Sequence, residues 1–210
     1  MNTQIGPKQI EAFERDGFTT IDRFIDGNEI AELLAGIDGI HMWHDQTLQK
    51  APWANATSWH MDDPEWSFHS YQSVTIWVAL DPVTIQNGCL YSLPGSHKVT
   101  RRDLDSATTG SDMPDLFDIY PELKNVEAVP MELKKGGAGV HNSMIAPAAG
   151  PNMTPYWRRA MTCSYMPVGA TFNGLQHVLS VERAGSMRVG EVLDDEEMVP
   201  LVWSNESVTA

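Results

Sequence analysis

The sequence has few cysteines, few basic residues and no long hydrophobic run. Its only two cysteines, Cys89 and Cys163, form no CxxC pair and lie in apolar segments. We therefore expect two buried free thiols rather than a disulfide. No apolar run approaches the length of a membrane span, and residues 1–9 contain no hydrophobic signal core. These absences exclude a disulfide scaffold and a membrane span, and they predict a cytoplasmic protein.

Positive charge is scarce. The chain has 14 Lys and Arg residues against 28 Asp and Glu residues, which gives a formal net charge of −14. Such an acidic surface repels phosphate backbones and anionic lipids, so neither nucleic acid nor a membrane is an expected partner. A small anionic molecule would need a local cluster of Arg or Lys. The length of 210 residues suits one globular domain with a sizeable core.

Short apolar runs separated by glycine and proline turns dominate the chain after residue 40. They occupy residues 75–80, 89–93, 139–141 and 160–165. Many short strands joined by such turns are typical of a β-sandwich or jelly roll. The sequence therefore predicts a mainly β core over residues 41–180.

The two ends of the chain carry different patterns. Residues 1–40 predict a helix that ends at Gly17, a strand over residues 18–21, and a second helix capped by Asn28. Residues 181–210 are acidic and predict a solvated edge. We expect both ends to belong to one domain that spans residues 1–210.

The segment Trp59-His60-Met61-Asp62 is the most informative part of the sequence. An H-x-D pair on an extended strand places both side chains on one face, because strand side chains alternate with a period of two. The imidazole and the carboxylate then converge on one point. They supply two of the three ligands of the 2-His-1-carboxylate triad that binds non-haem Fe(II). Taken alone, such a pair is more often a surface or hydrogen-bonded pair, so the surrounding motifs decide.

Several further motifs accompany His60 and Asp62. They are Trp43-His-Asp-Gln46, Lys50-Ala-Pro52, Ile76-Trp-Val-Ala-Leu-Asp81, Asn87-Gly-Cys-Leu90, Leu93-Pro-Gly-Ser-His97, Gly150-Pro-Asn152 and Arg158-Arg-Ala160. In this order and spacing, residues 41–167 resemble the core of the phytanoyl-CoA dioxygenase family. The resemblance implies a double-stranded β-helix (a jelly roll of the cupin kind) with N-terminal helices. It also implies that the cofactors are Fe(II) and 2-oxoglutarate.

One residue departs from the family pattern. The family carries a ligand histidine five residues before the Asn of the Gly-Pro-Asn motif, and this chain has Pro147 there. Proline has no side-chain donor atom and cannot bind a metal. His141 is the alternative candidate for the third ligand. The six residues between His141 and Pro147 span roughly 20 Å of straight strand, so a turn would have to bring His141 closer.

The other histidines and the chain length add little to the metal site. His44 and His97 are interpreted as structural groups or as partners of the ligands, and His69 and His177 give no signal. Family members usually carry a longer segment before the Trp-His-Asp-Gln strand. In this chain that segment is short, so it lacks residues that often help to enclose the substrate in the family.

The co-substrate residues follow from the same resemblance. Arg158 stands eleven positions after Pro147, where the family places its 2-oxoglutarate-binding arginine. Its planar guanidinium suits a carboxylate, although a surface Arg paired with an acidic residue is the alternative. Trp77 matches a family position near the co-substrate, or is a core tryptophan. Gln46 is a hydrogen-bonding candidate, or a strand-surface amide.

The resemblance implies a dioxygenase that uses Fe(II), 2-oxoglutarate and oxygen to hydroxylate a small-molecule substrate, with an atypical or impaired metal site. Two alternatives remain open because of Pro147. One is a non-catalytic binding protein with the oxygenase fold, and the other is an inactive variant that lacks the second ligand histidine. No motif identifies the substrate, the reaction outcome or the oligomeric state.

Overall fold

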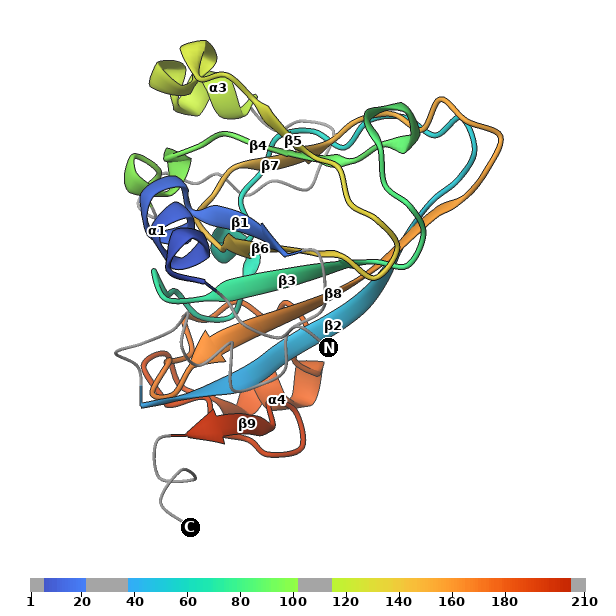
Figure 1. The fold of residues 1–210 in the computed structure, drawn as a ribbon. Helices are drawn as coiled ribbons and strands as arrows, with labels where there is room; N and C mark the ends of the chain where they lie inside the picture. Colours follow the sequence, from blue (N-terminus) through green and yellow to red (C-terminus); the bar gives the residue numbers. More distant parts are fainter. Residues whose placement is uncertain (1–5, 22–37, 102–114, 205–210) are drawn as a thin grey trace.

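The protein is described by a computed structural model over residues 6–21, 38–101 and 115–204. Two antiparallel β-sheets face each other, with short helices around them (Figure 1). The predicted mainly β fold with flanking helices is confirmed, while the helix expected after Asn28 lies outside the described residues. Among the residues described, no helix is both long and apolar enough to cross a membrane.

The larger sheet has six strands in the order β1-β6-β3-β8-β2-β9. In chain order these are β1 (Phe18–Ile21), β2 (Gly39–Lys50), β3 (Val74–Ala79), β6 (Ala138–Asn142), β8 (Arg158–Pro167) and β9 (Leu201–Ser204). The smaller sheet has three strands in the order β5-β4-β7. These are β4 (Leu90–Ser92), β5 (Val129–Met131) and β7 (Pro147–Ala149). Each predicted apolar run therefore lies within a strand or overlaps one.

The helices are short and lie outside the sheets. They are α1 (Pro7–Asp16), α3 (Leu116–Ile119) and α4 (Val181–Ser186), with 3-10 turns η1 (Asp63–Glu65), η2 (Ile85–Asn87), η3 (Ser96–Lys98) and η4 (Pro121–Asn125). Helix α1 ends as predicted at Gly17, which has a left-handed φ of 85° and donates its N–H to the Phe13 carbonyl. Side chains of α1, including Ile10 and Phe13, pack against the outer face of the larger sheet.

Strand alternation divides the larger sheet into an outer and an inner face. On β3, Ile76 belongs to the outer apolar cluster beneath α1, whereas Trp77 belongs to a cluster that includes residues of β4. On β8, Tyr165 faces the outer cluster and Ala160 the inner one. The inner face is therefore the face that meets the smaller sheet, and every other residue of the central strands points toward it.

A β-bulge at Trp43 changes the facing of β2. Met42 pairs with Tyr165, and His44 pairs with the next residue of β8 along the ladder, Ser164. Trp43 is therefore an extra residue in β2 that has no partner in the ladder. A bulge of this kind flips the side-chain alternation. Met42 consequently packs with the outer cluster, while His44 lines the inner face.

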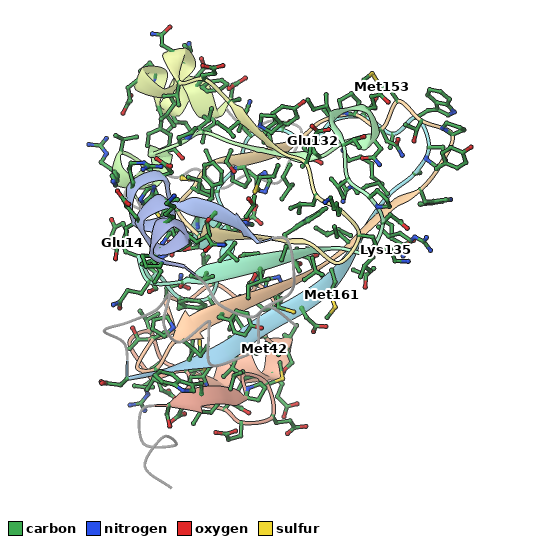
Figure 2. All side chains as sticks on the ribbon, in the orientation of Figure 1. Glu14, Met42, Glu132, Lys135, Met153 and Met161 are labelled. Atoms are coloured by element: carbon green, nitrogen blue, oxygen red, sulfur yellow. The ribbon has the colours of Figure 1, made fainter. Side chains whose placement is uncertain are left out.

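The strands β2 and β8 pair along their length from Ile40 and Pro167 to Lys50 and Arg158. They extend beyond the rest of the larger sheet and curve toward the smaller sheet (Figure 1). Met153 lies near the tip of the chain that joins β7 to β8 (Figure 2). The curved pair thus connects the two sheets at one side of the molecule.

The C-terminal segment differs from the solvated edge that its acidity predicts. Strand β9 pairs with β2 at the edge of the larger sheet, and α4 lies near it (Figure 1). Leu193 and Val199 are buried in a cluster with Trp43. The acidic side chains between them stay largely at the surface. The apolar residues spaced among the acids therefore anchor this segment to the fold.

Candidate active site

A cavity of about 610 Å³ lies between the two sheets. Its lining includes every residue that the sequence singled out for the metal and the co-substrate: Gln46, His60, Asp62, Trp77, His141, Pro147 and Arg158. These residues come from five strands and one irregular segment. The fold therefore brings the candidate residues together in one place.

His60 and Asp62 lie in an irregular segment rather than on the extended strand that the sequence predicted. The His60 N–H donates to the Pro147 carbonyl at 3.1 Å, but Asp62 has an α-helical backbone (φ −81°, ψ −44°) and precedes η1. The chain leaves the extended conformation at Asp62 because Asp63 and Pro64 are the first residues of η1, and proline favours the first turn of a helix. The side chains still approach each other, with His60 Nε2 3.6 Å from Asp62 Oδ1.

The hydrogen bond on the other side of the His60 ring fixes its tautomer. Nδ1 of His60 lies 2.9 Å from the Ser58 carbonyl oxygen. A carbonyl can only accept, so Nδ1 carries the proton, and in the neutral ring Nε2 keeps its lone pair. This is the arrangement that a metal-binding imidazole requires. The lone pair of Nε2 is therefore available near Asp62 Oδ1.

The second oxygen of Asp62 is held by other groups. Oδ2 lies 3.5 Å from His141 Nε2 and 3.4 Å from the Thr75 hydroxyl, which also contacts Ser164 Oγ at 3.0 Å. Burial raises the pKa of Asp62, but the hydrogen bond and charge of His141, with the charge of His60, outweigh it and lower the pKa below its ordinary value. Asp62 is therefore a carboxylate with one oxygen occupied and the other facing His60.

His141 reaches Asp62 from β6, where it pairs with Thr75 of β3. Its Nε2 faces Oδ2 of Asp62, and its Nδ1 is buried without a hydrogen-bond partner in the described structure. No set of three or more His, Cys, Asp or Glu side chains in the described residues has the geometry of a metal site. The described donors thus form a two-residue anchor, with His141 adjacent to it.

Pro147 lies at the start of β7, opposite Ser92 of β4. It is buried and lines the cavity beside His60, to whose N–H its carbonyl is bonded. Its ring supplies no donor atom at this position. The cavity wall next to the His60 and Asp62 pair is therefore apolar where a third ligand would be useful.

Arg158 lines the cavity from the end of β8. Its side chain is almost completely buried, and both Nε and Nη1 lack a hydrogen-bond partner in the described structure. The guanidinium lies over the Trp77 ring, 5.1 Å from its centroid. Burial lowers the pKa of Arg158 from its ordinary value, although the group stays charged. A buried cation without an acidic partner fits a site for an anion.

Two further residues surround Arg158. Lys50 pairs with it across the β2–β8 ladder, but the Lys50 ammonium already donates to the carbonyls of Asn55 and Gly150, each at 2.8 Å. Gln46 lies four residues before Lys50 on the same face and contacts His44. Arg158 is therefore the cation with unused donors, and Gln46 lies between it and the metal candidates.

Sequence reasoning found no signal at His177 and interpreted His44 as a structural group or a partner of the ligands. His44 and His177 both line the far end of the cavity, with their ring centroids 5.2 Å apart. His177 has a positive φ of 41°, which is unusual for a residue other than glycine. Trp43-His-Asp-Gln46 was a visible motif, but only the bulge turns His44 inward. No local pattern pointed to His177.

The sequence of the chain is similar to known proteins. The profile of the phytanoyl-CoA dioxygenase family matches residues 39–160. Dioxygenase lolE1 of Epichloe uncinata is 29% identical over 143 residues, which are 67% of this chain and 52% of that protein. Phytanoyl-CoA dioxygenase 1 of Oryza sativa subsp. japonica is 34% identical over 90 residues, 41% of this chain and 30% of that protein. The chain therefore matches about half or less of the length of these two relatives.

Solved structures share the fold. SnoK, a non-heme α-ketoglutarate-dependent carbocyclase from nogalamycin biosynthesis, superposes with a TM-score of 0.78 at 20% identity and covers 95% of this chain and 97% of its own. The epimerase SnoN, solved with Fe³⁺, α-ketoglutarate and nogalamycin RO, gives a TM-score of 0.68 at 19% identity, covering 93% and 98%. At such identities the likeness establishes the double-stranded β-helix fold.

Proposed function

The chain belongs to the phytanoyl-CoA dioxygenase family, and on that premise we propose that it is an Fe(II)- and 2-oxoglutarate-dependent dioxygenase that hydroxylates a small molecule. The observation that carries the proposal is the presence of two binding features in one cavity. The His60 and Asp62 pair offers nitrogen and oxygen donors, and buried Arg158 offers an unpaired cation. Chemistry of this class needs both features in the same enclosed space.

Iron would be held by Nε2 of His60 and Oδ1 of Asp62. The fixed tautomer of His60 and the occupied Oδ2 of Asp62 fit a metal bound through one atom of each residue. Iron, when bound with 2-oxoglutarate and oxygen, supplies the oxidising chemistry that the protein side chains lack. The protein's own part is to orient the donors and to keep water away from them.

His141 is the remaining candidate for a third iron ligand. Its Nε2 is directed at Oδ2 of Asp62, the oxygen that faces away from His60. This favours a role in orienting Asp62, and ligation would require the ring to turn toward the shared centre. An iron held by two residues would keep an additional position for water or another small ligand.

2-Oxoglutarate would bind through a carboxylate to Arg158. Nε and Nη1 of Arg158 are the unused donors, and a guanidinium fork matches a carboxylate geometrically. The indole of Trp77 supports the guanidinium from one side. Gln46 would donate a hydrogen bond farther along the bound co-substrate.

A non-catalytic carboxylate-binding protein is the second candidate function. Pro147 favours it, because this residue leaves the iron anchor with two protein donors. In that case Arg158 would still bind 2-oxoglutarate, whereas no succinate would form. Both functions therefore predict that Arg158 binds 2-oxoglutarate, and only the dioxygenase predicts that succinate forms.

The direct test is succinate production from 2-oxoglutarate by the purified full chain, with and without added Fe(II). We expect iron-dependent succinate formation that is lost in Asp62→Ala and in Arg158→Ala, and that is kept in Arg159→Ala. Binding of 2-oxoglutarate without any succinate would instead support the binding protein. Absence of both binding and turnover would contradict both functions.

A further inference from the structure

The cavity end that lies away from Arg158 is walled by aromatic rings. His44, Trp66 and His177 all line it. The His44 ring meets the Trp66 ring edge-on at 6.2 Å and the His177 ring edge-on at 5.2 Å. His177 in turn stacks on Trp43 at 5.8 Å. The contacts between neighbouring rings fix their orientations, so the aromatic wall at this end of the cavity is formed before a substrate binds.

This end is far from the cations of the cavity. Lys50 pairs with Arg158 at one end of the β2–β8 ladder, whereas His44 pairs with Ser164 farther along it, beside the bulge at Trp43. Six residues of strand separate His44 from Lys50, which is roughly 20 Å. Lys50 is occupied by two carbonyls, and Arg158 is assigned to the co-substrate. No Lys or Arg in the described lining lies at the aromatic end.

The ionisable groups at the aromatic end are neutral or acidic. Burial lowers the pKa of His44 to about 4, with the charge of His177 acting in the same direction. Burial also lowers the pKa of His177. Glu65 also lines the cavity close to His177. A carboxylate or phosphate group placed at this end would find no Lys or Arg of the described lining to pair with.

Unused hydrogen-bonding capacity remains at this end. A neutral imidazole offers one donor and one acceptor. Nε2 of His44 lies 3.4 Å from the Gln46 amide nitrogen, and Nδ1 is buried without a partner in the described structure. The hydroxyl groups of Thr162, which donates to the Gln46 carbonyl, and of Ser164, which contacts Thr75, belong to residues that line the cavity, and each oxygen can still accept a hydrogen bond. All of these groups are uncharged and suit the oxygen of a hydroxyl or carbonyl group.

We propose that the end of the cavity formed by His44, Trp66 and His177 is a substrate subsite for an uncharged ring that carries a hydroxyl or carbonyl group. The rings of the wall bind the flat face of the substrate, and His44 orients its oxygen. The inference rests on the proposed function and names the substrate class for it. It disfavours a free carboxylate as the group bound against this wall, because no Lys or Arg of the described lining lies at this end of the cavity.

The test compares two small probes of the same size, benzyl alcohol and benzoate. Each is titrated into the full chain saturated with 2-oxoglutarate and free of metal, so that benzoate cannot bind iron, and binding is followed by saturation-transfer NMR. We expect benzyl alcohol to bind at least tenfold more tightly than benzoate. Equal affinities, or no binding of benzyl alcohol at its solubility limit, would overturn the proposal.

Matched variants assign the selectivity to His44. His44→Phe keeps a flat ring of similar size but removes both nitrogens, so benzyl alcohol should bind at least fivefold more weakly. His44→Gln keeps a donor and an acceptor and should stay within twofold of the parent. His177→Asn, which tolerates the positive φ, gives a second variant that should weaken benzyl alcohol at least threefold. If neither His44→Phe nor His177→Asn changes the affinity, the subsite is wrong.

The same samples separate this inference from the proposed function. Calorimetry with 2-oxoglutarate reports on Arg158 and should give the same affinity in the parent and in His44→Phe. Failure of 2-oxoglutarate to bind would contradict the proposed function. Normal 2-oxoglutarate binding together with equal affinities for the two probes would contradict only the subsite.

Discussion

At the scale of single residues, Arg158 and Arg159 are neighbours with opposite surroundings. Arg159 is exposed and bonded to both carboxylate oxygens of Asp81, at 2.8 and 2.9 Å. Arg158 is buried, and two of its three nitrogens have no partner in the described structure. A buried charge without a partner lowers stability unless a ligand neutralises it. The free protein therefore carries a cost at Arg158 that an anion would remove.

Replacement of Arg158 by Met should separate binding from stability. Charged hydrogen bonds contribute about 1.5–3 kcal/mol each, so Arg158→Met should weaken 2-oxoglutarate binding by about 100-fold or more. The free energy of unfolding without ligand should stay equal or rise, because an unpaired buried charge is gone. Calorimetry and urea denaturation measure the two quantities. Arg159→Met is the control and should bind 2-oxoglutarate like the parent; equal binding by Arg158→Met would refute the assignment.

The stability of the protein should depend on pH through His44. Its pKa is about 4 in the folded chain, against an ordinary value of 6.5. The unfolded chain therefore takes up the proton first as pH falls, and stability is fully present above pH 6.5 and lost between pH 6.5 and 4. From pH 7 to pH 5 the parent should lose about 1 kcal/mol more than His44→Phe, after allowance for the partly solvated ring. Urea denaturation at both pH values measures this loss. An equal loss of unfolding free energy from pH 7 to pH 5 in the parent and in His44→Phe would contradict the prediction.

Pro147→His should raise the affinity for Fe(II). The new imidazole would stand on β7 beside His60, where the cavity wall now has no donor. Loss of a group that only supports a metal ligand typically costs about 10–100-fold in affinity, so gain of a ligand should add at least about tenfold. Anaerobic Fe(II) titration of both proteins measures the change.

His141→Ala serves as the companion variant in that titration. If His141 orients Asp62, the variant should weaken iron binding moderately in both the parent and Pro147→His. Tight iron binding by the parent that Pro147→His leaves unchanged and His141→Ala abolishes would show instead that His141 is the third ligand. In that result the two-residue anchor would be incorrect.

At the scale of elements, β3 separates two roles along one strand. Thr75 faces the cavity and reaches Asp62 Oδ2 at 3.4 Å, whereas Ile76 is buried in the outer cluster beneath α1. Adjacent residues of one strand thus serve the metal candidates and the core. The alternation follows from strand geometry and was readable from the sequence.

Substitutions at these two positions should have opposite effects. Ile76→Ala creates a cavity in the core and should lower the free energy of unfolding by about 2–4 kcal/mol, with the metal donors unchanged. Thr75→Val keeps the volume but removes the hydroxyl, and should weaken Fe(II) binding about tenfold or more with a smaller effect on folding. Urea denaturation and iron titration of both variants measure the pair. Equal loss of iron binding in both would mean that Thr75 acts only through packing.

The elements also show which parts of the site the sequence could not predict. The runs that became β3, β6 and β8 were visible, and alternation on β8 distinguishes Arg158 from Arg159. The bulge at Trp43 was not visible, because its effect depends on the pairing of β2 with β8. His177 was missed for a related reason: it approaches His44 through the folding of a distant loop, which no local pattern records.

The segment that holds His60 and Asp62 shows the same limit in another form. Strand alternation predicted their convergence, yet the structure achieves it with an α-helical Asp62 at the start of a 3-10 turn. Backbone hydrogen bonds to Pro147 and Ser143 place the segment. The prediction of proximity thus agreed with the structure, while the local conformation behind it was wrong.

At the scale of the whole molecule, charge is distributed unevenly. The chain has a formal net charge of −14, yet the two cations that line its cavity lie together on paired residues of β2 and β8. An acidic exterior disfavours polyanionic partners, while the buried Arg158, with unpartnered donors, suits a single small anion. The double-stranded β-helix brings this anion site and the candidate iron donors into one enclosed space.

The central claim is that Fe(II) and 2-oxoglutarate bind together in this cavity. The most direct measurement is an anaerobic titration of the full chain with Fe(II), with and without 2-oxoglutarate, followed by charge-transfer absorption and calorimetry. In this account the protein gives the iron only two donors, so the donor atoms of 2-oxoglutarate should raise the affinity for iron. By thermodynamic reciprocity, iron should raise the affinity for 2-oxoglutarate by the same factor. The coupling should vanish in His60→Ala and in Arg158→Met. Independent binding of the two ligands, or no iron binding with 2-oxoglutarate present, would contradict the account.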